Sequence, residues 1–305
     1  MLKSENQLNL YGLNNQINEL FNLYKNDNLP NKILLSGSKG IGKSTMAYHL
    51  INLILSKNEN HHYDLKNLKI NPENKSFRLI QNKTSSNFIL IDIHADKKSI
   101  DISQIRDLII NLQKSSFNDA PRFILVDNIE FLNLNSINAL LKILEEPTVN
   151  CYFILINNNK RILPTLKSRC LNFRISLSYK DTIDVTNKLV KQDIYDLINP
   201  ELLNYYISPG KIYNLVEFSK ENDIDLRDIK LNALIDLIIS KNFYKKNNFV
   251  ENLVLDLIEF YLVKNISKKY SDFYSYFLTK INNTKKFNLD FESLFLEFKL
   301  KILNE

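Results

Sequence analysis

Three of the chain's five glycines lie within six residues of one another, at a spacing suited to binding phosphate. Gly37, Gly42, Lys43 and Ser44 match the pattern G-x-x-x-x-G-K-[ST]. In this pattern the glycines let backbone N–H groups turn toward phosphate oxygens, and the start of the following helix adds partial positive charge. The lysine reaches the β- and γ-phosphates, and the serine hydroxyl ligates Mg²⁺. We therefore predict a loop that binds ATP and magnesium, formed by Gly37, Ser38, Lys39, Gly40, Ile41, Gly42, Lys43, Ser44 and Thr45.

The residues on either side of the loop must supply the elements that position it. Residues 33–35 form an apolar run typical of a short buried strand. Apolar residues then recur with helical spacing at Met46, Ala47, Leu50, Ile51 and Ile54. A strand, a glycine loop and a helix, in that order, form the context that a phosphate-binding loop requires. The alternative, a chance glycine turn before a helix, fits poorly in a chain with so few glycines.

A second apolar run, residues 123–126, ends in Asp127. An aspartate at the end of such a strand can hold a nucleotide's magnesium, so we predict Asp127 as a ligand beside Ser44. A strand-end carboxylate that is merely solvated is the alternative. The next residue, Asn128, stands where an ATPase of this kind often carries a glutamate, and an amide cannot accept a proton from water. Glu130 could substitute, but its side chain is expected to point elsewhere if the strand ends at Asn128.

Strand and helix patterns alternate through the first half of the chain. Apolar runs typical of strands lie at 87–94, 122–128, 151–157 and 171–175, and helical patterns lie at 103–113 and 134–147, the second ended by Pro147. This alternation predicts an α/β fold with a parallel sheet flanked by helices. The loop and Asp127 then share the carboxyl edge of the sheet, where such folds bind ligands.

The second half of the chain is helical in pattern. Two or three helical segments lie between residue 176 and about 222, and longer ones follow to residue 305. A helical bundle core accounts for most of the apolar positions. Aromatic residues at helical spacing could belong to that core or to a subunit interface, and the sequence leaves both open for Phe273, Tyr274, Phe277, Phe295 and Phe298.

Length and composition limit the number of domains and the class of protein. The 305 residues suffice for two or three domains, and 44% hydrophobic and 24% charged residues are ordinary for a globular protein. With no apolar run near the roughly 18 residues of a membrane span and no signal-peptide core, we expect a cytoplasmic protein without a membrane partner. Cys151 and Cys170 lack metal-ligand spacing, and the adjacent His61 and His62 are expected in an exposed loop. A net charge of +6 permits nucleic-acid contact but does not require it.

Four segments, in this order, resemble bacterial clamp-loader subunits of the AAA+ family: GLNNQINEL, LPNKILLSGSKGIGKSTMAYHL, FILVDNIEFLNLNSINALLKILEEP and ILPTLKSRC. The resemblance covers about residues 8–175, and within the family it looks most like the delta-prime subunits of DNA polymerase III. It implies an AAA+ nucleotide-binding module at 1–175, an all-α lid domain at 176–222 and an all-α collar domain for oligomerisation at 223–305. It also implies partners, since such subunits form a hetero-pentameric ring that loads the sliding clamp onto primer–template DNA.

The resemblance extends to two further site residues. Asn157 matches a polar residue that senses the γ-phosphate. Arg169, within the motif SRC, matches an arginine finger that reaches the neighbouring subunit's site and acts there in trans. The chain has seven arginines against 33 lysines, so an arginine kept here suggests a need for its planar fork. The alternative is an ordinary surface salt bridge.

Departures from the family pattern bear on hydrolysis. Motor subunits of the loader carry a four-cysteine zinc insert, which residues 56–87 lack, and an acid in the place of Asn128. They also carry a lid arginine where this chain has Gly210, followed by Lys211. We expect a subunit that uses ATP and Mg²⁺ without zinc and is a weak ATPase alone, or none. The alternative is an autonomous or motor-type AAA+ ATPase, such as a gamma/tau-like loader subunit or a helicase loader.

Overall fold

The structure, a computed structural model, describes residues 3–94, 97, 99–113, 119–145, 150–203, 207–246, 248–265, 271–287 and 289–303. The chain forms two compact units. The first unit is Met1–Lys188 with Ser208–Gly210, and the second is Leu189–Ile207 with Lys211–Glu305. The three-domain division expected from the sequence stays a prediction.

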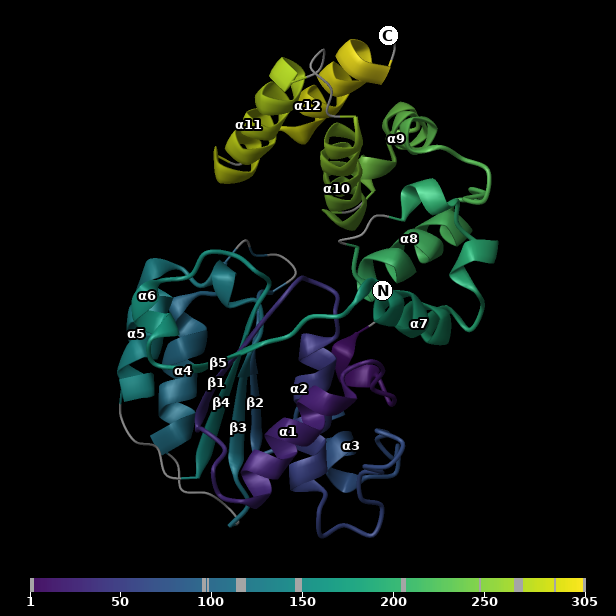
Figure 1. Cartoon of the computed structure of the whole chain (residues 1–305). Coiled ribbons are helices and arrows are strands. Elements are labelled where there is room, and N and C mark those ends of the chain that lie inside the picture. The colour runs from purple at the N-terminus through teal and green to yellow at the C-terminus, as the bar shows by residue number, and fades with distance from the viewer. Residues whose placement is uncertain are drawn as a thin grey trace. The chain divides into compact units, whose positions relative to one another are not determined.

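A five-stranded parallel sheet forms the centre of the first unit (Figure 1). Its strands are β1 (Lys32–Ser36), β2 (Phe88–Ile91), β3 (Arg122–Val126), β4 (Cys151–Asn157) and β5 (Leu171–Arg174). Their order across the sheet is β2-β3-β4-β1-β5, so the phosphate loop's strand, β1, lies between β4 and β5. The strands expected from the sequence are all present, and the predicted parallel α/β sheet is confirmed.

Helices cover both faces of this sheet. They are α1 (Asn14–Lys25), α2 (Lys43–Leu55), α3 (Lys75–Gln81), α4 (Ile102–Gln113), α5 (Leu134–Glu145) and α6 (Pro164–Lys167), with short 3₁₀ turns η1 (Ser4–Asn6) and η2 (Ile129–Phe131). A further helix, α7 (Tyr179–Val190), follows β5, and its last two residues belong to the second unit. The helices expected at 103–113 and 134–147 correspond to α4 and α5. Pro147, expected to end the second of them, lies outside the described residues.

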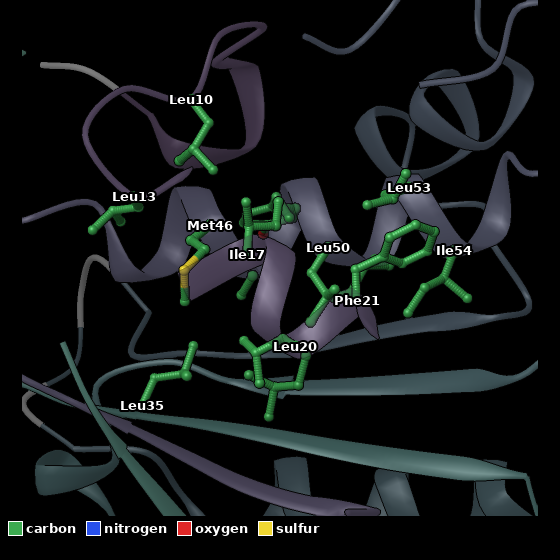
Figure 2. Close-up of a cluster of buried hydrophobic side chains, with 14 of the residues drawn as sticks. Leu10, Leu13, Ile17, Leu20, Phe21, Leu35, Met46, Leu50, Leu53 and Ile54 are labelled. Atoms are coloured by element: carbon green, nitrogen blue, oxygen red, sulfur yellow. The ribbon is translucent and has the colours of Figure 1, made fainter. Parts of the chain in front are cut away.

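Alternation along β4 shows why the sheet is apolar on both sides. Phe153 and Leu155 belong to a buried cluster that contains apolar residues of α4, α5 and α6. Ile154 and Ile156 belong to the opposite cluster, which contains apolar residues of α1 and α2. Figure 2 shows part of this second cluster, where side chains of α1, α2 and the sheet meet. A strand buried on both faces reads as a continuous apolar run because neighbouring residues point to opposite faces.

The polar stretch at 56–87 is more ordered than its composition suggests. It contains α3, and Tyr63, Leu68 and Ile70 are buried. Buried His49 holds this stretch to the N-terminal segment, with Nδ1 2.9 Å from the Tyr63 hydroxyl and Nε2 3.0 Å from the Gln7 carbonyl oxygen. Burial lowers the pKa of His49 to about 4, so the neutral ring accepts from the tyrosine and donates to the carbonyl. His61 and His62 are exposed, as expected.

The second unit is helical in its described parts. Its helices are α8 (Pro209–Glu221, whose first two residues belong to the first unit), α9 (Leu231–Ser240), α10 (Asn248–Lys264), α11 (Ser271–Phe287) and α12 (Phe291–Phe298), with 3₁₀ turns η3 (Ile194–Asp196), η4 (Pro200–Leu202) and η5 (Phe243–Lys245) and a π-helical end η6 (Lys299–Leu303). Phe277, Phe295 and Phe298 are fully buried, so these three belong to the core. Phe277 and Phe298 meet edge to face, with ring centroids 5.2 Å apart. Among the described helices, none has the length and apolar character needed to cross a membrane.

Candidate nucleotide-binding site

The glycine loop links the end of β1 to the start of α2 at the carboxyl edge of the sheet. The Gly37 N–H donates to the Asn157 carbonyl at the end of β4, at 3.2 Å. A Cβ on Gly37 would lie 2.3 Å from the Ile175 carbonyl oxygen, so any larger residue would push the loop off the sheet. Gly42 precedes α2 in the left-handed conformation, with φ of 94°, which L side chains rarely adopt. These two positions explain why the turn requires glycine.

Lys43, the first residue of α2, lies buried beneath the loop with 3% of its surface exposed. Its ammonium donates to the Gly37 and Ser38 carbonyls at 2.9 and 2.8 Å, and to Asn158 Oδ1 at 3.0 Å. Burial lowers the pKa of Lys43 to about 8, although the carboxylates of Asp127 and Glu130 act in the opposite direction. The ammonium is therefore still mostly charged at neutral pH, inside a ring of acceptors.

Asp127 follows β3 and faces the start of α2. Its carboxylate is hydrogen-bonded by the Ser44 side chain and by the Asn128 N–H, the latter at 2.8 Å. Burial, and next the charge of Asp92, raise the pKa of Asp127 to about 6 against these hydrogen bonds and the charge of Lys43. The structure thus brings together Lys43, Ser44 and Asp127, the three side chains with predicted roles in holding phosphate and magnesium.

The turn after β3 overturns one expectation. Asn128 adopts the left-handed conformation, with φ of 54°, and this turns the chain into η2. Because of that turn, Glu130 does not point away from the site: the Asn158 side-chain amide donates to Glu130 Oε1 at 2.8 Å. The expectation failed because it extended the strand geometry through Asn128, whereas β3 ends at Val126.

Asn158 connects the separate parts of the site. Besides accepting from Lys43, it donates to Asn128 Oδ1 at 2.9 Å, and Asn128 Nδ2 in turn donates to Asp92 Oδ1 at 2.8 Å. The amides thus bridge the ends of β2, β3 and β4. Sequence reasoning missed Asn158 and Asp92, although Asn158 directly follows the apolar run at 151–157 and Asp92 lies within the run at 87–94.

Asn157, the predicted γ-phosphate sensor, makes a local contact instead. Its amide donates to the Lys160 carbonyl at 2.9 Å, and its Oδ1 accepts from the Lys160 N–H at 3.1 Å. It is buried, with 6% exposure. A sensing role for Asn157 stays a prediction, and in this structure Asn158 is the neighbour whose side chain contacts Lys43.

The other predicted loop residues have different environments. Ser38, Lys39 and Gly40 are exposed, and Gly42, Ser44 and Thr45 are partly buried. Ile41 packs into the apolar cluster beneath the loop, so its side chain anchors the loop instead of facing a phosphate. The Asn159 amide lies 3.4 Å from Ser38 Oγ.

The segment that starts α8 packs on this loop. The Ser208 hydroxyl donates to the Lys39 carbonyl at 2.7 Å, and the Gly210 N–H donates to the Gly40 carbonyl at 2.9 Å. A Cβ on Gly210 would lie 2.9 Å from the Gly40 carbonyl oxygen. Where the resemblance implies an arginine in motor subunits, this chain therefore has a glycine whose backbone supports the loop directly.

Arg169 lies two residues after α6 and contacts a different set of groups. Its Nη1 donates to the Thr165 carbonyl at 2.8 Å, and its Nη2 forms an ion pair with Glu145 at the end of α5. The arginine side chain is 32% exposed and that of Glu145 is 54% exposed. The surface salt bridge considered as the alternative role is thus present within the chain. The role in trans stays a prediction.

The donor set fits a nucleotide with its magnesium. The glycines allow an anion to approach the backbone closely, and Lys43 supplies a cation. Mg²⁺ prefers hard oxygen ligands, and the Ser44 hydroxyl and Asp127 carboxylate are such ligands. A bound nucleotide would supply the phosphoanhydride chemistry; the chain's own residues bind, orient and neutralise charge. With Asn128 next to Asp127, the carboxylates of Asp92 and Glu130, which accept from the Asn128 and Asn158 amides, are candidates for acting on water.

Comparison with known proteins identifies the family. The family described as DNA polymerase III, delta subunit, matches residues 12–178. The DNA polymerase III subunit gamma of Buchnera aphidicola subsp. Schizaphis graminum is 26% identical over 272 residues, which is 87% of this chain and 67% of that protein. The subunit delta' of Pseudomonas aeruginosa is 31% identical over 139 residues, 45% of this chain and 40% of that protein. The match therefore spans only about two-fifths of that delta' protein.

A search of solved structures also finds similarity. One similar structure is a DNA polymerase III gamma subunit-related protein from Thermotoga maritima, 16% identical, with a TM-score of 0.47 and 91% of this chain and 96% of that chain covered. The fold class rests on the sheet and helices described above. Because the family match covers more than half of the 305 residues, the chain belongs to the DNA polymerase III clamp-loader family.

Proposed function

We propose that this chain is a delta-prime-like subunit of the DNA polymerase III clamp loader. In that role it assembles with other loader subunits into a hetero-pentameric ring and helps to load the sliding clamp onto primer–template DNA during replication, in the cytoplasm. The family match and the similarity to a delta' protein over the first half of the chain support this role. The exposed apolar residues Tyr276, Leu296 and Leu300 in the second unit offer surface for subunit contacts.

The chain binds ATP with Mg²⁺ through its own phosphate loop. Support comes from the convergence of Lys43, Ser44 and Asp127 at one sheet edge, with the lysine charged and buried. These three side chains contribute in different ways. Lys43 neutralises phosphate charge, and the oxygens of Ser44 and Asp127 hold the metal. No zinc is required for this site.

Hydrolysis by the chain alone is slow or absent. The observation that supports this most directly is the side chain of Asn128, an amide where the family's motor subunits have an acid. That amide is already engaged on both sides, by Asp92 and by Asn158. An amide held in this way can neither accept a proton from water nor supply the missing negative charge.

Arg169 acts on the site of a neighbouring motor subunit. Its partners within the chain, Glu145 and the Thr165 carbonyl, belong to α5 and α6 and not to the phosphate loop or the turn after β3. A planar, permanently charged fork is suited to stabilising the charge of a transferring phosphate, and such arginines contribute about 10³-fold or more to turnover.

A motor-type ATPase is the second candidate. Two observations favour it: the similarity to gamma subunits extends along 87% of the chain, and the Glu130 carboxylate lies within the Lys43–Asn158 network. In this alternative, Glu130 replaces the acid that motor subunits carry at the position of Asn128, and the chain hydrolyses ATP by itself.

Two measurements on the purified chain separate these possibilities. Calorimetry with MgATP should give saturable binding for the wild type and none for Lys43→Ala, because the main cation at the phosphates is lost. Steady-state turnover without partners should lie far below the roughly 1 to 10³ per second typical of enzymes. Equal affinity of the two proteins would rule out the proposed site. Turnover of about one per second or faster that disappears in Glu130→Gln would favour the motor-type candidate.

A further inference from the structure

The last residue of α5 has a charge that its position does not favour. A helix C-terminus carries partial negative charge, so a carboxylate there is destabilising and a cation is preferred. Glu145 ends α5, and half of its side chain is exposed. The compensating charge comes from Arg169, 24 residues further along the chain. Exposed ion pairs of this kind contribute little to stability, so stability alone is a weak reason for an acid at this place.

The guanidinium of Arg169 is held at two points. Nη1 donates to a carbonyl of α6, that of Thr165, and Nη2 donates to the Glu145 carboxylate. These contacts lie on two different helices, so together they define the plane of the fork as well as its position. A guanidinium has five N–H donors in a fixed arrangement, and two contacts leave three for an anion.

We infer that Glu145 is a positioning residue for Arg169, which it holds in the orientation in which the guanidinium meets a phosphate on the adjacent subunit. This inference rests on the proposed function of Arg169. Without the carboxylate, one contact remains and the long side chain is free to rotate. It must then be ordered during the reaction, at a cost in rate that a preorganised group avoids.

The test uses the reconstituted loader and a double-mutant cycle. Steady-state ATPase is measured for wild type, Glu145→Gln, Arg169→Ala and the double variant. Glu145→Gln should lower kcat at the adjacent motor subunit's site about tenfold with KM for ATP unchanged, since only orientation is lost. In the Arg169→Ala background the same replacement should have no further effect, because there is no guanidinium left to position. Asp225→Asn removes the carboxylate partner of another arginine, Arg227, and as the matched control should leave kcat unchanged.

A measurement on the isolated chain separates positioning from assembly. Side-chain NMR of Arg169 should show slow rotation of its guanidinium in the wild type and in Glu145→Asp, and fast rotation in Glu145→Gln. Wild-type or higher ATPase in Glu145→Gln would overturn the inference. So would a Glu145→Gln replacement that lowers ATPase equally in the wild type and in the Arg169→Ala variant. If Arg169→Ala itself has wild-type activity, the proposed trans role fails, and the inference fails with it. A loss in Arg169→Ala without one in Glu145→Gln defeats the inference alone.

Discussion

Replacing Asp127 by asparagine should stabilise the chain while removing its response to nucleotide. The pKa of this carboxyl is about 6, first because of burial and next because of Asp92, against an ordinary value of about 3.9. Since the folded-state pKa is the higher one, the folded chain holds the proton more tightly, and stability falls as the pH rises from about 4 to about 6. At about 1.4 kcal/mol per pH unit, the free energy of unfolding lost over this pH range is about 3 kcal/mol. Asp127→Asn should recover about 1 to 3 kcal/mol of it at pH 7.5, because the amide keeps only part of the hydrogen bonding.

With magnesium and ATP present, the wild type should become more stable than Asp127→Asn. The wild type gains about 4 kcal/mol at a ligand concentration of about a thousand times Kd, which exceeds the 1 to 3 kcal/mol that the substitution recovers. The variant lacks a metal ligand and should gain little. Without nucleotide the two proteins should therefore be closest in stability below about pH 3, where the Asp127 carboxyl is protonated in both the folded and the unfolded state, and should diverge as the pH rises.

Hydrogen exchange of β3 and β4 amides, combined with urea unfolding, provides the assay. Exchange is needed because the chain forms two compact units, and a single unfolding curve could report on either. Asp64→Asn is the matched control: this carboxylate is exposed and accepts from Asn67, and that bond lowers its pKa. Its replacement should not stabilise the chain. If Asp127→Asn unfolds more easily than the wild type at pH 7.5 without nucleotide, the assigned environment of Asp127 is wrong.

Four further outcomes are expected. MgATP affinity should be highest between pH 6 and 8, because Asp127 takes up a proton below this range and Lys43 loses one above it. An affinity that stays constant in calorimetry from pH 5 to pH 9 would contradict this prediction. Asn128→Glu should raise turnover by the isolated chain if the rest of the site is competent, as a phosphate-release assay would detect. Gly210→Ala should weaken MgATP binding about tenfold, because its Cβ displaces the loop, and unchanged calorimetric affinity would contradict this. Arg169→Ala and Arg169→Lys should both lower ATP hydrolysis by the adjacent motor subunit of a reconstituted loader about 10³-fold while leaving this chain's own ATP binding intact.

The sequence predicted the parts of the site that depend on local chemistry. The phosphate loop follows from glycine spacing, and the strands follow from apolar runs bounded by polar residues. Asp127 was predicted because a strand end and a carboxylate coincide there. These features need only a few neighbouring residues to be recognised, which is why their positions agree with the structure.

The features that were missed depend on contacts between distant segments. Asp92 and Asn158 join the site only because β2, β3 and β4 are neighbours in the sheet, an order that the linear sequence does not state. The direction of Glu130 depends on one left-handed residue, Asn128, and asparagine tolerates that conformation without requiring it. The support of the loop by Gly210 joins segments about 170 residues apart, and a single glycine gives no signal of its partner.

The mass of the assembled complex tests the proposed loader role most directly. The chain would be mixed with gamma/tau-type and delta-type loader subunits, with and without MgATP, and examined by native mass spectrometry. We expect a five-subunit complex that contains one copy of this chain and several motor subunits. A chain that joins no such complex would contradict the proposed role. So would a ring built from several copies of this chain alone, since that is the behaviour of a motor-type ATPase.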